Sequence, residues 1–134
     1  MMSTINVSEN KVSILNRFIS KKFYNTRFFP NETSGRGWDQ NVMQRKYEVL
    51  LVSQFTLYGF LKGDKPDFHV AMPLEKVKPF YASVVDRFKK SYNPDAIKEF
   101  LVFVFGPPAL MLLSMVNLVN DGPVTMQLDS QSPK

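Results

Sequence analysis

The sequence of 134 residues has no cysteine and contains a single histidine and a single tryptophan. Without cysteine there is neither a disulfide scaffold nor a thiolate-ligated metal site, and a reducing compartment is the natural inference. Since His69 is the sole imidazole, a catalytic triad and a histidine-based metal site are both disfavoured. Residues 1–18 also lack the uninterrupted apolar core of a secretory signal. We expect no metal and no other cofactor.

The composition suits one globular domain with a basic surface. Hydrophobic residues make up 44% of the chain and aromatic residues 13%, which is enough to bury a core. The formal net charge is +5, and a basic surface attracts polyanions by releasing counterions from their phosphates. Many small soluble proteins carry as much charge, so nucleic-acid binding is one possibility among others.

Apolar spacing predicts two helices and a buried strand. Helical spacing of the apolar side chains occurs within residues 11–29 and again from Val77 until Asn93. Pro79 must lie in the first turn of the second helix or bend it. The nearly continuous apolar run Tyr47–Tyr58 predicts a strand covered on both faces.

The remaining segments predict loops and short strands. Residues 59–73 contain glycine and proline among charges and are interpreted as a loop. Residues 100–120 carry no charge, so a membrane span is the alternative to consider. We reject it, because Gly106-Pro107-Pro108 would break a helix and suits a turn between two strands. Residues 115–127 are expected to form a later strand broken at a Gly-Pro step.

Three motifs in order carry a resemblance to a known family. SQFTLYG begins at Ser53, KGDKPDFHVAMP begins at Lys62, and NDGPVT begins at Asn120. The stretch from about Lys21 to Ser130 resembles D-aminoacyl-tRNA deacylases, particularly those of eukaryotes and plants. The resemblance implies a single-domain α/β fold with a barrel-like sheet and flanking helices.

Two departures from the family pattern lead us to divide the chain. Residues 1–20 do not match the family's opening strand and hairpin, so we expect the first strands to be missing. The segment around residues 99–116 is longer and more apolar than in the family. We therefore predict a non-family segment at 1–20, an incomplete deacylase domain at 21–130 and a disordered tail at 131–134. An alternative transcript or a mis-joined gene model would explain both departures.

The resemblance implies an enzyme that hydrolyses the ester joining a D-amino acid, or glycine, to tRNA. The implied protein is a cytoplasmic homodimer that binds the aminoacylated end of tRNA, without a cofactor and without a membrane. In that family the Gly-Pro peptide is cis and enters the partner subunit's site, where its carbonyl oxygens exclude an L side chain. Gly122 and Pro123 would form this chiral filter here.

The other implied site residues line the opposite wall and hold the substrate. The catalytic segment would be Ser53, Gln54, Phe55 and Thr56. Its backbone N–H groups and the Gln54 amide would stabilise the ester carbonyl, while the substrate's 2′-hydroxyl assists water. Thr56 has also been considered a nucleophile in the family. The residues expected to contact substrate or adenosine are Phe68, Asn120, Val124 and Thr125.

Three alternatives remain open from the residues alone. His69 suits a loop histidine bonded to backbone, and Asp67 and Glu48 suit solvated charges better than an acid and base pair. Phe68 suits a core aromatic nearly as well as a stacking surface for adenine. The chain as a whole suits, as its second interpretation, a weak or inactive isoform that binds tRNA ends or pairs with a full-length subunit.

Overall fold

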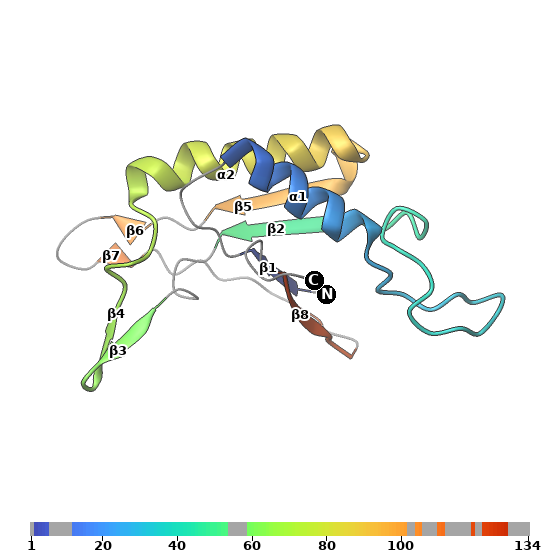
Figure 1. The fold of residues 1–134 in the computed structure, drawn as a ribbon, viewed down its shortest axis with the longest axis horizontal. Coiled ribbons are helices and arrows are strands. Elements are labelled where there is room, and N and C mark those ends of the chain that lie inside the picture. Colours follow the sequence, from blue (N-terminus) through green and yellow to red (C-terminus); the bar gives the residue numbers. More distant parts are fainter. Residues whose placement is uncertain are drawn as a thin grey trace.

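Two helices cover one face of a pair of parallel strands, and the other strands form three further pairs (Figure 1). This computed structural model describes residues 2–5, 12–53, 59–101, 104–105, 110–111, 119 and 122–128. The mixed α/β class predicted from the sequence is confirmed. The described strands lie in four two-stranded sheets and do not, within those residues, close into the expected barrel.

The helices α1 (Val12–Asn25) and α2 (Leu74–Ser91) confirm both helix predictions. The apolar stripe of α2 faces the core, where Val84, Val85 and Phe88 are buried. Pro79 lies inside α2 beyond its first turn, so the alternative that placed it in that turn is wrong. In this part of the chain, neither helix has the length and apolar character needed to cross a bilayer.

Aromatic side chains join the two helices. The ring of Phe88 lies 5.5 Å from that of Phe23 and 5.3 Å from that of Tyr24, measured between centroids. The Tyr24 hydroxyl donates a hydrogen bond of 3.0 Å to the Phe88 carbonyl. Burial, with a smaller contribution from Tyr92, raises the pKa of Tyr24. The helix pair is therefore fixed by packing and by a buried polar contact.

The strand β2 (Val49–Ser53) pairs in parallel with β5 (Ile97–Leu101). Such a pair needs a long crossover, and α2 provides it. Val49 and Leu51 are buried, but Leu50 is 50% and Val52 37% exposed. The prediction of a strand covered on both faces is therefore wrong for these residues. Side chains alternate between the faces of a strand, and the helices cover only one of them.

A hairpin replaces part of the loop predicted at 59–73. Its strands are β3 (Phe60–Lys62) and β4 (Lys65–Asp67), which pair antiparallel. Gly63 in the turn has a φ of +64°, which glycine adopts at little cost. A 3₁₀ turn, η2 (Pro94–Ala96), follows the second helix and leads into β5.

The last strands partly confirm the predictions for the apolar end of the chain. The strands β6 (Val104–Phe105) and β7 (Leu110–Met111) pair antiparallel, as expected for two strands joined by a turn. The turn at 106–108 lies outside the described residues, as do the tail at 131–134 and the predicted strand before Val119.

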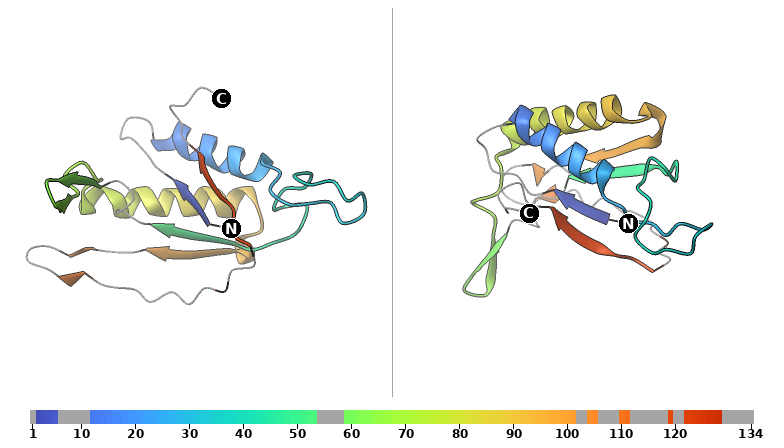
Figure 2. Two further views of the ribbon diagram at one scale, coloured as in Figure 1. Left: turned by 90° about the horizontal axis from the view of Figure 1, so that it is seen from below. Right: turned by 45° about the vertical axis from the view of Figure 1, so that its right-hand side comes forward.

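The opening segment contributes a strand of its own. The strand β1 (Met2–Ile5) pairs in parallel with β8 (Thr125–Leu128), and Figure 2 shows the two side by side. The sequence led us to expect the family's first strands to be absent, and the structure has one strand here. The first and last strands of the described chain thus belong to the same sheet.

Candidate active site

The predicted catalytic segment begins where β2 ends. Ser53 is the last residue of β2 and is half-buried, whereas Gln54, Phe55 and Thr56 lie outside the described residues. The Tyr81 hydroxyl of α2 donates a hydrogen bond of 2.7 Å to the Leu51 carbonyl. This contact ties the carboxyl end of the strand to the helix two residues before Ser53. The start of the segment therefore sits on a rigid element.

The Gly-Pro step precedes β8 and faces solvent. Gly122, Pro123, Val124 and Thr125 are all exposed, with Val124 at 37%, and Asn120 lies outside the described residues. Gly122 has a φ of +71°, in the left-handed region that side chains other than glycine rarely adopt. A Cβ placed there would meet nothing within 4 Å. Backbone conformation, and not lack of space, favours glycine at this position.

The two predicted halves of the site lie apart in the chain. In Figure 1 the head of β2 lies toward the left and β8 starts toward the right, and both views of Figure 2 keep them separate. The structure therefore does not bring the carboxyl end of β2, where Ser53 lies, next to the start of β8, which follows the Gly122-Pro123 step. Each half is presented from a different part of the molecule.

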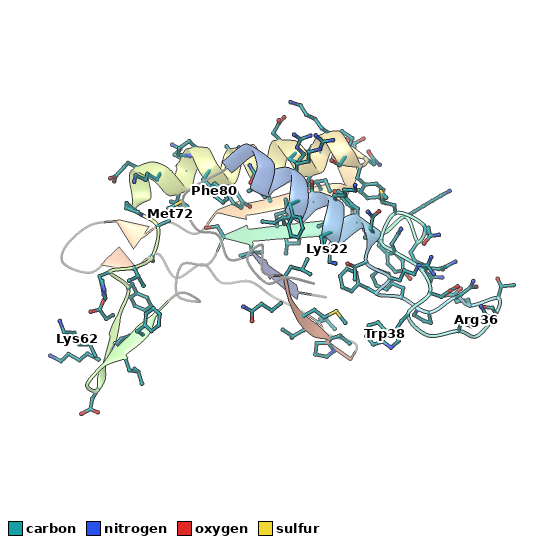
Figure 3. All side chains as sticks on the ribbon, viewed as in Figure 1. Lys22, Arg36, Trp38, Lys62, Met72 and Phe80 are labelled. Carbon is teal, nitrogen blue, oxygen red and sulfur yellow. The ribbon has the colours of Figure 1, made fainter. Side chains whose placement is uncertain are left out.

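Of the residues predicted to contact substrate or adenosine, Phe68 lies by the β3–β4 hairpin, apart in sequence from Val124 and Thr125 at β8. Phe68 directly follows β4 and is half-buried. On the hairpin itself Phe60 is 58% and Leu61 78% exposed, and Figure 3 shows Lys62 projecting from its side. The hairpin therefore offers apolar and basic side chains beside Phe68.

His69 lies in a turn, as expected for a loop histidine, but its ring pairs with the Asp67 carboxylate and not with the backbone. The His69 backbone N–H donates a hydrogen bond of 2.8 Å to Asp67 Oδ1, and the ring Nδ1 lies against the same oxygen. The backbone donor first, and the ring second, lower the pKa of Asp67. An aspartate that accepts the N–H two residues on forms a common turn, so the D-x-H spacing was a signal for this pair.

The described residues do not form a site for acid–base catalysis by side chains. Within the described residues the two carboxylates have separate partners, since Glu48 Oε1 lies 3.7 Å from Lys98 Nζ and Asp67 bonds to His69. Within this same part of the chain, the His69 ring has no hydroxyl partner that would serve as a nucleophile, and no three ligands are grouped as a metal would need.

Comparison with known proteins identifies relatives over most of the chain. A family model described as "D-Tyr-tRNA(Tyr) deacylase" matches residues 1–129, including the opening segment that we expected to fall outside the family. Human D-aminoacyl-tRNA deacylase 1 is 47% identical over 84% of this chain and 50% of its own length. The D-aminoacyl-tRNA deacylase of Dictyostelium discoideum is 42% identical over 98% of this chain and 82% of its own.

A solved structure is also similar. It is that of a c-Myc DNA Unwinding Element Binding Protein, which is 46% identical and superimposes with a TM-score of 0.57. The superposition covers 63% of this chain and 56% of that one. The chain spans 50% of the length of the human relative and of the D-aminoacyl-tRNA deacylase 1 of Mus musculus.

Proposed function

Because the chain belongs to the D-Tyr-tRNA(Tyr) deacylase family, we propose that it hydrolyses the ester bond of D-aminoacyl-tRNA. The substrate class is a D-amino acid, or glycine, esterified to the terminal adenosine of tRNA. The reaction releases the amino acid and returns free tRNA. Its natural setting is the cytoplasm, which the absence of cysteine supports.

The separation of the two halves of the site supports a homodimer. Ser53 ends a strand at one side of the chain, and the Gly122-Pro123 step is exposed at another. An exposed step of this kind is free to enter the site of a second copy. In a two-fold dimer each copy then supplies one half to each site. We infer that neither site is complete without the partner.

The chemistry follows from backbone groups and not from a side-chain base. The Gly122 and Pro123 carbonyls accept hydrogen bonds from the α-amino group of the substrate. They also occupy the space that an L side chain would need, so L esters are rejected sterically. The segment from Ser53 to Thr56 holds the ester carbonyl and stabilises its developing charge through N–H donors. The 2′-hydroxyl of the substrate assists the attacking water. Phe68, Asn120, Val124 and Thr125 hold the aminoacyl-adenosine end.

One observation carries the proposal. Gly122 is exposed, has open space around it and yet adopts a φ of +71° directly before a proline. A left-handed residue followed by a proline makes a stiff turn, and within the residues that the structure describes no close contact at Gly122 accounts for it. A stiff, solvent-facing turn suits a ligand-binding role better than a structural one.

The test compares hydrolysis of D-tyrosyl-tRNA and L-tyrosyl-tRNA by the purified chain, by Pro123→Ala and by Pro30→Ala. Pro30 is an exposed loop proline outside the site and serves as the matched control. We expect release from the D ester only, with at least a tenfold loss in Pro123→Ala and none in Pro30→Ala. Equal hydrolysis of both esters would refute the chiral filter.

The second candidate function is binding without turnover. It is favoured by the absence of a nucleophile and base pair in the described residues and by coverage of only 50% of the human relative. The similar c-Myc DNA Unwinding Element Binding Protein is, by its name, a nucleic-acid binder. Folded protein that binds tRNA but releases no amino acid would establish this candidate in place of the enzyme.

A further inference from the structure

A hollow of about 250 Å³ lies between α1 and α2, at a site to which no function has been assigned above. Seven side chains from the two helices line it: Arg17, Ser20, Lys21, Tyr24, Asn25, Arg87 and Ser91. The five from α1 follow one face of the helix, and the two from α2 are one turn apart. The hollow is therefore built by the helix pair that the core fixes.

The hydroxyl groups of Tyr24 and Ser91 in the hollow already donate hydrogen bonds to backbone carbonyls. Tyr24 and Ser20 are buried, and the Tyr24 hydroxyl donates to the Phe88 carbonyl. The Ser91 hydroxyl donates to the Arg87 carbonyl at 2.8 Å. Donors for a ligand then come from the charged groups at the rim and from the Asn25 amide.

Three cations at the rim have no acidic partner. Among the described residues, Arg17, Lys21 and Arg87 form no ion pair. Three other lysines of α2 and β5 do have one: Lys89 with Glu99, Lys90 with Asp86, and Lys98 with Glu48. Within the residues that the structure describes, the positive charge around the hollow is thus not compensated by ion pairs, whereas that of these three lysines is. An uncompensated cluster concentrates anions.

We propose that this hollow binds a phosphate group of the tRNA backbone. Two guanidinium groups and one ammonium group supply the forked and single donors with which proteins hold phosphate oxygens. The hollow is small and opens to solvent, which suits one phosphate on the outside of a larger molecule. The choice of tRNA rests on the proposed function, and inorganic phosphate is the other source of the same chemistry.

The first arm of the test measures binding of labelled, unacylated tRNA by fluorescence anisotropy between about 50 and 200 mM salt. The variant Lys21→Gln/Arg87→Gln is compared with Lys22→Gln/Arg36→Gln, which removes the same charge. Lys22 and Arg36 are exposed and do not line the hollow, and Figure 3 shows both away from α2. We expect about a tenfold loss of affinity for the first variant only, with the salt slope reduced by roughly 1 to 2.

The second arm titrates inorganic phosphate and follows the backbone amides of Lys21 and Ser91 by NMR. Shifts there, without any loss in the tRNA arm, would refute the tRNA source and assign the hollow to a free phosphate. Equal loss in both tRNA variants, or no response in either arm, would overturn the proposal. Far-ultraviolet circular dichroism confirms that each variant folds.

The two proposals fail separately. Wild-type protein that binds tRNA through the hollow but leaves D-tyrosyl-tRNA intact would refute the hydrolase and support this inference. Active protein whose tRNA affinity is unchanged in Lys21→Gln/Arg87→Gln would refute this inference alone.

Discussion

Replacing Gly122 with alanine tests whether the left-handed turn before Pro123 is needed for activity. The added Cβ would meet nothing within 4 Å, so its cost comes from the φ of +71° alone. A residue with a side chain loses about 1–2 kcal/mol in this region. If the cost is met by opening the turn, the equilibrium ratio of native to opened turn falls by about 5- to 30-fold, which is the upper limit of the loss of native turn.

We expect hydrolysis of D-tyrosyl-tRNA by Gly122→Ala to fall by up to this factor under subsaturating substrate. The turn is exposed and precedes β8, so it opens without unfolding the core, and the melting temperature should change little. Asparagine tolerates the left-handed region better than alanine, and Gly122→Asn should therefore lose less activity.

Gly37→Ala is the matched control for this experiment. A Cβ added at Gly37 would also meet nothing within 4 Å, but this glycine lacks the positive φ. Its replacement should leave the rate unchanged. Full activity in Gly122→Ala, or an equal loss in Gly37→Ala, would refute the argument from backbone conformation.

Two further predictions concern stability and pH. Phe88 is 1% exposed and packs on two aromatic rings, so Phe88→Ala should lower the free energy of unfolding in urea by about 3–5 kcal/mol. Leu61→Ala, at a side chain 78% exposed, should change it by less than about 0.5 kcal/mol, and similar losses in both would contradict the assigned core. The pKa of Asp67 is lower in the folded chain than in the unfolded one. The stability that its hydrogen bonds contribute is therefore present at pH values above the unfolded pKa and is lost as pH falls through the folded pKa. The His69 amide resonance should therefore titrate with a midpoint below the ordinary pKa of an aspartate side chain and lose this titration in Asp67→Asn; a midpoint at or above that ordinary pKa would contradict the pairing.

The helices could be predicted from the sequence because their signal is local. The apolar positions of α2 recur at helical spacing, and Val84, Val85 and Phe88 are indeed buried. The same spacing indicated α1, whose Ile19 and Phe23 lie in the core. An apolar stripe on a helix can be identified from the sequence before the element that packs against it is known.

The faces of β2 and the hairpin could not be predicted as securely, for different physical reasons. An apolar run does not tell how many faces of a strand are covered, and Leu50 is 50% exposed in this chain. In the hairpin, Pro66 argued against a strand, although the two-residue turn Gly63-Asp64 was a signal for one. The turn chemistry outweighed the low strand propensity of the residues beside it.

The order of the motifs along the sequence does not predict how the parts of the candidate site are arranged in space. The sequence locates Ser53 and the Gly122-Pro123 step along the chain, but their separation in space depends on how the strands are arranged. The hollow between the helices has no motif at all, because its cations come from both α1 and α2. Only tertiary structure places Lys21 near Arg87.

The parallel pairing of β1 with β8 has a consequence for how the chain is made. Met2 pairs with Thr125, so β1 leaves the ribosome well before its partner and stays without one until β8 has been synthesised. Pairs between residues so distant in sequence form late, because the intervening chain must first be brought together. The helix pair and β2–β5 can assemble before this step. Completion of the β1–β8 sheet is therefore among the last events of folding, and β1 waits unpaired while the core forms.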